Sequence, residues 1–432
     1  MKTIIIAGTN SGVGKTTITK ALLTLIDNAQ AFKMGPDFID PSFYRYITKR
    51  NVYNLDLFCY QEDKLKYVFN RYKKSINIIE GVMGLYGGLG FTLDNHSTAH
   101  TARTLDAPIL LVVDGKHKDS SIQAEVLGYI KRDERLNIKG VIINNVSKKM
   151  YQYLSNALQE INIKTYGYLP KVQDITIPER HLGLLQAQDI DNLDLNLNRL
   201  KEVANETIDV GEIVKDFDHT FNYQGIEYFD IIKDIFLNKT IAITKDESFS
   251  FFYDLHLEML KCSGANIVYF SPLHDTSLPT ADLYYFSGGY PEIYVEELSK
   301  NTSIFKEIKE TSKAIYAECG GYIYLSKSIL INNKKTSLVN LFFSDIVMTK
   351  MLDFKHFGYL DIITKDGYKI KGHEFHYSKL IDSKEKDNYY NVVNKEYITG
   401  VIKENIKGGY PHILWLSNLE YYKKIFNGGK DE

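Results

Sequence analysis

The stretch Ala7-Gly-Thr-Asn-Ser-Gly-Val-Gly-Lys-Thr-Thr17 decides the fold of the first half of the chain. It follows the apolar run 4–6 and precedes a helical pattern over residues 17–26. A strand, a glycine-lined turn and a helix therefore come in the order that a phosphate-binding loop needs. The usual motif has its first glycine at the position of Thr9, whereas here it is Gly8, one residue early.

The residues that would contact a phosphate are nevertheless present. The glycines of the turn, the lysine and the hydroxyls of the first helical turn are Gly12, Gly14, Lys15, Thr16 and Thr17. A turn that binds nothing would leave the lysine and the threonine unexplained, so the stretch predicts an ATP site. A partition-type ATPase would need an extra lysine at Asn10 and is not expected.

Length and composition indicate a globular protein with two domains. The chain has 432 residues, which are too many for one ordinary core. Of these residues 44% are hydrophobic and 25% are charged, a composition typical of globular proteins. A net charge of −2 gives no reason to expect nucleic acid. The N-terminal apolar run is too short for a signal peptide and no run is long enough to span a bilayer, so we expect no membrane partner and a cytoplasmic protein.

Apolar runs alternate with helical ones in both halves of the chain. Continuous Ile, Val and Leu runs at 4–6, 76–79, 107–113 and 140–143 predict a doubly wound α/β domain with a parallel sheet and ligands at the carboxyl ends of its strands. A second α/β pattern has its strands at 240–244, 266–270, 282–286 and 314–317. We expect domains at 1–190 and 239–432, joined by a polar linking region at 191–238.

The second half carries a candidate nucleophile, Cys319, in the segment AIYAECGGYIYL at 314–325. The pattern predicts a strand, a sharp turn and a helix, so we expect an exposed thiol whose pKa is lowered by a helix N-terminus. Gly288 and Gly289 follow another strand and could donate N–H groups to an oxyanion. His412 could act as the base of the cysteine.

The remaining cysteines and histidines predict no further site. Cys59 and Cys262 lie in no comparable setting, and the three cysteines are spaced neither as a disulfide framework nor as a zinc site. His373 and His376 in the segment HEFH lack a third ligand for a metal, so we interpret them as structural or substrate-facing.

The order of cysteine, glycine donors and late histidine resembles that of class I glutamine amidotransferases. Over nearly its whole length the chain resembles the cobyrinic acid a,c-diamide synthase family, and the segments that carry the resemblance are 8–16, 33–41, 54–56, 80–86, 97–100, 180–183, 317–321 and 372–378. The first domain also resembles dethiobiotin synthetase, which shares the longer loop spacing. The resemblance implies that ATP activates the a and c carboxylates of cobyrinic acid as acyl phosphates, and that ammonia from glutamine amidates them in cobalamin biosynthesis.

Chemistry suggests roles for the residues of the nucleotide site. Lys15 would neutralise the transferred phosphate and Thr16 would hold Mg²⁺. Asp37, Asp40 and Glu80 would bind Mg²⁺ or the substrate carboxylate, with an aspartate turn or cap as the alternative for the two aspartates.

One position has two interpretations, and two others depart from the pattern of the family. Asn144 resembles the adenine-contacting asparagine of dethiobiotin synthetase, although an Asn-Asn turn explains it almost as well. Gly87 stands where the family usually has aspartate, and Leu414 where relatives often have a second histidine. The change at Gly87 leaves a variant in rate or substrate open.

Other substrates and one other class of protein remain as alternatives. The same chemistry could act on hydrogenobyrinic acid or nickel sirohydrochlorin, so the expected partner is a corrinoid or a related tetrapyrrole. The alternative from another class is a regulatory nucleotide-binding protein with an inert glutaminase domain. The presence of Cys319, the paired glycines and His412 argues against it. A homodimer stays open, because the sequence does not address the oligomeric state.

Overall fold

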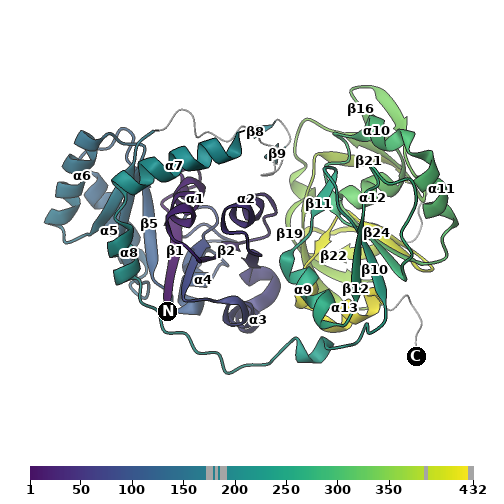
Figure 1. Ribbon diagram of the computed structural model, residues 1–432, viewed down its shortest axis with the longest axis horizontal. Coiled ribbons are helices and arrows are strands. Elements are labelled where there is room, and N and C mark those ends of the chain that lie inside the picture. Colours follow the sequence, from purple (N-terminus) through teal and green to yellow (C-terminus); the bar gives the residue numbers. More distant parts are fainter. Residues whose placement is uncertain (172–178, 181–182, 185–191, 384–387, 427–432) are drawn as a thin grey trace. The chain divides into compact units, whose positions relative to one another are not determined.

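The structure is a computed structural model that describes residues 1–171, 179–180, 183–184, 192–383 and 388–426. It divides into two compact units, Met1–Ile226 and Glu227–Glu432 (Figure 1). Both are α/β, as the sequence predicts.

The first unit is built on a parallel sheet of seven strands in the order β3-β2-β4-β1-β5-β6-β7. The strands are β1 (Lys2–Gly8), β2 (Gln30–Met34), β3 (Tyr53–Leu55), β4 (Ile76–Glu80), β5 (Ile109–Asp114), β6 (Ile138–Asn144) and β7 (Thr165–Leu169). The apolar runs predicted as strands are β1, β4, β5 and β6. Ile4, Ile5 and Ile6 are all fully buried, as expected for a strand with helices on both faces.

Helices connect these strands and cover the sheet (Figure 1). They are α1 (Lys15–Leu25), α2 (Ile39–Thr48), α3 (Leu57–Tyr72), α4 (Thr98–Leu105), α5 (Ile122–Arg132) and α6 (Lys148–Glu160). A two-residue hairpin, β8 (Glu179–Arg180) with β9 (Gly183–Leu184), follows β7. Residues 181–182, in the middle of the predicted segment 180–183, lie outside the described residues.

Two further helices complete the first unit, although the sequence predicts a linking region from residue 191. These are α7 (Leu193–Thr207) and α8 (Val210–Asp216), and α7 lies beside α1 (Figure 1). Leu197, Leu200 and Ala204 share one face of α7 and are buried in the core of this unit. The unit therefore extends to Ile226, because a narrow apolar stripe in a polar segment is enough to dock a helix.

The second unit has a ten-stranded mixed sheet. Its parallel part contains β12 (Asn266–Phe270), β10 (Thr240–Thr244), β13 (Leu283–Phe286), β15 (Ala314–Glu318) and β24 (Ile406–Gly409), in that order. The four strands predicted in this half are β10, β12, β13 and β15. The sheet continues in antiparallel pairs through β23 (Tyr397–Lys403), β22 (Asn388–Val392), β19 (Phe357–Thr364), β20 (Lys369–Phe375) and β25 (His412–Ile413).

Smaller elements surround this sheet. A four-stranded sheet holds β16 (Ser326–Ile331), β17 (Lys334–Ser337), β18 (Phe342–Met348) and β21 (Ser378–Ser383), and a two-stranded one pairs β11 (Phe249–Phe251) with β14 (Gly288–Gly289). The helices are α9 (Asp254–Cys262), α10 (Val295–Lys300), α11 (Thr302–Glu310), α12 (Gly320–Leu325) and α13 (Leu419–Phe426).

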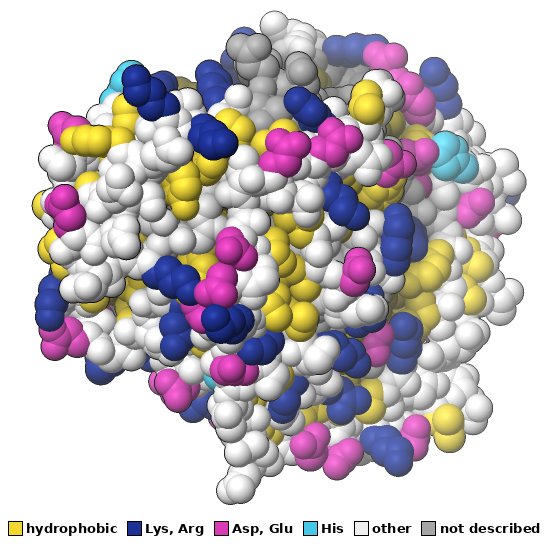
Figure 2. All heavy atoms as spheres, turned by 60° about the vertical axis from the view of Figure 1, so that its left-hand side comes forward, with side chains coloured by type: hydrophobic (Ala, Val, Ile, Leu, Met, Phe, Trp, Pro, Cys, Tyr) yellow, Lys and Arg dark blue, Asp and Glu magenta, His cyan; other side chains and the backbone are white. Residues whose placement is uncertain are grey.

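The surface shows no segregation of charge on the face drawn in Figure 2, where lysines and arginines are interspersed with aspartates and glutamates. Among the helices of the described residues, none is both long and apolar enough to cross a bilayer.

Candidate active sites

The predicted phosphate-binding loop connects β1 to α1. Gly14 caps the helix with a φ of 96°, a left-handed conformation that favours glycine, and a Cβ there would lie 2.0 Å from Asn144 Nδ2. The Asn144 side chain donates to the backbone oxygen of Val13, which holds the loop from the β6 side. The Leu85 N–H donates to Gly8 O at 2.7 Å, so the segment after β4 closes another side. An adenine contact by Asn144 stays a prediction.

Predicted metal and substrate residues converge beside this loop. Thr16 Oγ1 donates to Glu80 Oε1 at 2.6 Å and lies 3.4 Å from Asp40 Oδ2. Tyr44 OH donates to the other oxygen of Glu80. Three segments that are distant in the sequence, the start of α1, the start of α2 and the end of β4, therefore bring their oxygen atoms together.

Lys33, in β2, occupies the middle of this group and was not among the predicted site residues. Its Nζ lies 2.6 Å from Asp40 Oδ2, 2.9 Å from Glu80 Oε2 and 3.4 Å from Asp37 Oδ2. Although burial opposes it, the three carboxylates hold the pKa of Lys33 well above its ordinary value, so the lysine is charged. The sequence offered only a lysine in the short segment QAFKM, and the structure shows that this segment is a strand whose five residues are all buried.

The two aspartates differ in their electrostatics. Burial and the neighbouring Asp40 raise the pKa of Asp37 to about 6. Burial also opposes ionisation of Asp40, but Lys33 lowers its pKa below the ordinary value. Asp37 Oδ1 accepts from the N–H of Ile39 at 2.8 Å, so this oxygen forms the aspartate turn that was the alternative, while Oδ2 faces Lys33.

The oxygen atoms around Thr16 fit a magnesium ion that arrives with a nucleotide. Among the described residues no three acidic, histidine or cysteine side chains form a group that could hold a metal by itself. A magnesium ion in a phosphate-loop site needs no such group, because phosphate oxygens and water supply most of its ligands beside one hydroxyl and one or two carboxylates.

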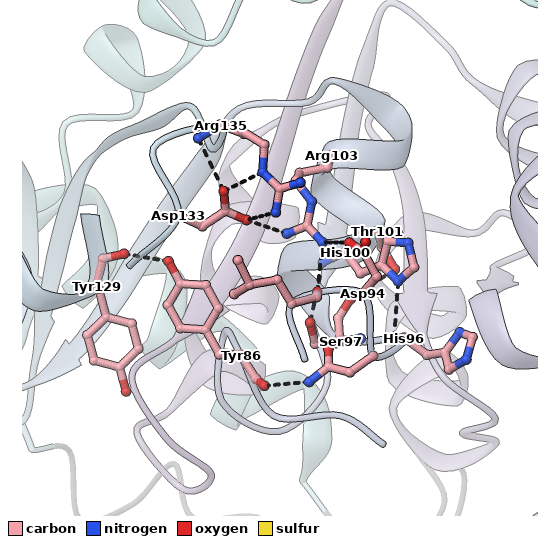
Figure 3. Close-up of polar contacts among 12 residues, drawn as sticks. Tyr86, Asp94, His96, Ser97, His100, Thr101, Arg103, Tyr129, Asp133 and Arg135 are labelled. Carbon is pink, nitrogen blue, oxygen red and sulfur yellow. Dashed lines mark hydrogen bonds and ion pairs between the residues drawn. The ribbon is translucent and has the colours of Figure 1, made fainter. Parts of the chain in front are cut away.

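The loop that follows Glu80 is fastened at its base by a polar network (Figure 3). Arg103, in α4, donates to Asp133 Oδ2, to Asp94 Oδ1 and to the backbone oxygen of Leu93. The Asn95 side chain donates to Tyr86 O, and the backbone oxygen of Asn95 accepts from the N–H of Leu89 at 2.7 Å. The network fixes both ends of the loop next to the phosphate-binding loop.

Gly87 lies in a tight turn of this loop. Its N–H donates to Gly84 O at 2.9 Å, and a Cβ added to it would lie 3.1 Å from Met83 Cβ. The aspartate that the family usually has here would fit only if the turn moved by a few tenths of an ångström, so the observed turn favours glycine at this position.

In the second unit, Cys319 stands at the turn between β15 and α12. Its φ and ψ of 46° and −106° are strained for a residue with a side chain, as at a nucleophile elbow, and its N–H donates to Gly409 O at 2.8 Å. Cys59 lies in the first turn of α3, which directly follows β3, but there its N–H donates to Asp56 Oδ1 at 2.8 Å, whereas Cys262 ends α9.

The environment of the thiol differs from the prediction. Cys319 is 6% exposed, and burial together with the carboxylates of Glu292 and Glu374 raises the pKa of its thiol. The expected lowering by a helix N-terminus was wrong, because α12 has only six residues and the thiol is surrounded by acidic groups. The raised pKa favours the neutral thiol, which needs a base in order to react.

Gly288, Gly289 and His412 meet at this elbow. A Cβ at Gly288 would lie 2.3 Å from His412 Cε1, and a Cβ at Gly320 would lie 2.8 Å from the backbone nitrogen of Gly289. Only glycine permits this approach of the histidine ring and the elbow to strand β14. The structure thus brings the four predicted residues together, and their roles stay proposals.

The predicted segment HEFH lies against the candidate base. His373 pairs with His412 across β20 and β25, and the two rings stack with centroids 4.9 Å apart. Tyr253 OH lies 2.6 Å from His373 Nε2. Burial opposes ionisation of Glu374, but hydrogen bonds from His356 and His376 lower its pKa to about 2. The segment therefore packs against the ring of His412 and helps to hold it in place.

Glu318 was also missing from the predicted site. Its Oε2 lies 3.5 Å from His412 Nδ1. The available signal was a glutamate at the end of a strand that is otherwise apolar and buried.

Comparison with known proteins agrees with this geometry. The family model of the CobQ/CobB/MinD/ParA nucleotide binding domain matches residues 4–185, and that of the CobB/CobQ-like glutamine amidotransferase domain matches residues 240–419. A cobyrinate a,c-diamide synthase of Fusobacterium nucleatum is 42% identical over 99% of this chain and 100% of its own length. That of Caldanaerobacter subterraneus is 37% identical over 98% of this chain and 96% of its own length. That of Methanocaldococcus jannaschii is 36% identical over 100% of this chain and 100% of its own length.

Proposed function

The chain belongs to the cobyrinate a,c-diamide synthase family, and from this premise we propose that it amidates the a and c carboxylates of cobyrinic acid with ATP and glutamine. One observation carries the proposal. A phosphate-binding loop with converging carboxylates and a cysteine elbow with an adjacent histidine occur in one chain, in the two regions that match the two family models. We place the reaction in the cytoplasm, where ATP and glutamine are available.

The first unit would activate the carboxylate. The substrate oxygen attacks the γ-phosphorus of ATP, an O–P bond forms and the bond to the leaving ADP oxygen breaks. Lys15 offsets charge on the transferred phosphate. Thr16, Asp40 and Glu80 would hold Mg²⁺, which supplies further charge neutralisation when bound. Lys33 keeps the acidic side chains together until the ligands arrive.

The second unit would release ammonia from glutamine. Cys319 Sγ attacks the carboxamide carbon, its proton passes to His412 and then to the leaving nitrogen, and the C–N bond breaks. N–H groups of Gly288 and Gly289 stabilise the oxyanion. Water hydrolyses the thioester to glutamate. Ammonia attacks the acyl phosphate, so that a C–N bond forms and phosphate leaves.

A large substrate with an apolar ring suits the loop that follows Glu80. Met83, Leu89 and Phe91 on this loop are 53%, 46% and 100% exposed. Exposed apolar side chains gathered on one segment are typical of a binding surface. We infer that they cover the ring of the macrocycle while one of its carboxylates reaches the phosphate-binding loop, and the network of Figure 3 holds the loop in place for this contact.

The proposal is tested with purified protein, ATP, Mg²⁺, glutamine and one macrocycle at a time: cobyrinic acid, hydrogenobyrinic acid or nickel sirohydrochlorin. We expect release of ADP and glutamate that depends on cobyrinic acid, with a mass change for each of two amidations. The same products with another macrocycle alone would move the assignment to that substrate. Absence of glutaminase activity with every macrocycle would favour a regulatory protein with an inert second domain.

A further inference from the structure

Glu318 faces the candidate base from the strand that also carries the candidate nucleophile. It ends β15, directly before Cys319, and its Oε2 lies 3.5 Å from His412 Nδ1. Both side chains are only 3% exposed. A buried carboxylate this close to a ring nitrogen has a strong electrostatic effect on it, because little water screens the pair.

The carboxylate of Glu318 is held in place by three donors. Its Oε1 accepts from the N–H of Ile413 at 3.1 Å and from Tyr316 OH at 2.5 Å. Its Oε2 accepts from Tyr285 OH at 2.9 Å. These contacts come from two neighbouring strands and from the histidine segment itself, so the side chain cannot turn away from His412 without losing them.

The opposite edge of the histidine ring faces the site of reaction. A Cβ at Gly288 would lie 2.3 Å from His412 Cε1 and 3.1 Å from Nε2, which places this edge against strand β14. Leu414, two residues after the histidine, is a fully buried leucine and offers no acceptor. The two nitrogens of His412 thus face different groups: Nδ1 faces the carboxylate of Glu318 at 3.5 Å, and Nε2 faces the side of the oxyanion glycines.

We propose that Glu318 is the positioning residue for His412: its carboxylate accepts a hydrogen bond from Nδ1–H, which keeps Nε2 unprotonated so that it can take the proton of Cys319, and it stabilises the imidazolium that results. The inference rests on the proposed roles of Cys319 and His412. A positive charge formed in this buried place needs a counter-ion, which Glu318 supplies without any movement.

The test compares Glu318→Gln and Glu318→Asp with a control, Asp345→Asn. Gln keeps an oxygen for Ile413 and removes the charge, whereas Asp keeps the charge. Asp345, in β18, accepts from Ser328 Oγ and is paired with Lys327 and Lys335. For Glu318→Gln we expect kcat of glutamine hydrolysis to fall on the order of 10² to 10⁴-fold, as for an orienting carboxylate. The KM for glutamine should change less than about threefold, and amidation with added ammonia should persist.

Glu318→Asp should recover activity above Glu318→Gln, and Asp345→Asn should stay within about twofold of the parent. Glutamine hydrolysis by Glu318→Gln within about tenfold of the parent would overturn the proposal, as would an Asp variant no better than the Gln variant. If thermal melting shows that the Gln variant is unfolded, the Asp variant decides instead: the proposal requires a change in kcat for glutamine hydrolysis with a KM for glutamine close to that of the parent. Glutaminase activity in Cys319→Ser would instead refute the proposed function of the second unit.

Discussion

Glu292, one of the carboxylates that raise the pKa of Cys319, provides a test of how a buried acid affects the stability of the second unit. It follows Gly289 by three residues, and its Oε2 is buried without a hydrogen-bond partner among the described residues. Burial raises the pKa of Glu292 from 4.5 to about 7. The substitution Glu292→Gln keeps the shape of the side chain and removes the buried charge.

The sign of the effect follows from proton linkage. Because its pKa is raised by folding, the native state keeps a proton that the unfolded chain has released between about pH 4.5 and about pH 7. The glutamate therefore destabilises the fold increasingly as pH rises through this window. The shift corresponds to at most about 3 kcal/mol, and because the side chain is partly exposed we expect about 2 kcal/mol above neutral pH.

Urea unfolding of the two proteins measures this difference. Trp415 is the single tryptophan of the chain and is fully buried in the second unit, so its fluorescence reports on the unit that holds Glu292. We expect Glu292→Gln to be more stable than the parent by about 2 kcal/mol at about pH 8 and equally stable near pH 4.5. The exposed Glu310→Gln serves as control and should show no such trend. A difference that is constant with pH, or that grows toward acid, would refute the reasoning.

Three further substitutions separate the functions of the two units. Cys319→Ser should lose glutamine-dependent amidation and keep ammonia-dependent amidation, and failure of ammonia to restore a folded variant would contradict the division of labour. Lys33→Met removes the lysine that pairs with three acidic side chains. We therefore expect ammonia-dependent amidation to be lost and stability to fall by about 3 kcal/mol in urea unfolding, against little change in the surface variant Lys49→Met. Phe91→Ser should raise the KM for the macrocycle alone in steady-state assays, and an unchanged KM would remove the apolar loop from the substrate site.

The parts of the fold that sequence patterns predict are those with strong local signals. Strands β1, β4, β5 and β6 are continuous apolar runs, since a parallel sheet covered on both faces needs no polar positions. Strand β3 has three residues and β2 contains Lys33, so neither gives such a signal. The antiparallel strands β19 and β23 of the second unit mix buried with half-buried or exposed positions, and α7 shows only a thin apolar stripe.

The candidate sites divide in the same way. The phosphate-binding loop and the elbow of Cys319 are each encoded within about a dozen consecutive residues, and the structure brings their predicted neighbours together. Burial of the thiol, and then Glu292 and Glu374 from other segments, raise the pKa of Cys319, and none of these causes can be read from the sequence around the cysteine. Lys33 and Glu318 were missed because a charged residue in a buried strand becomes informative only when its partners are known.

The neutral state of Cys319 has a consequence for the durability of the protein. Peroxides and electrophiles attack thiolates far faster than thiols, and oxidation beyond sulfenic acid is irreversible for most cysteines. Burial and neighbouring carboxylates raise the pKa of Cys319, which disfavours the thiolate and so lowers the rate at which oxidants attack this sulfur. The surroundings that oppose formation of a thiolate therefore also favour the reduced form of this cysteine.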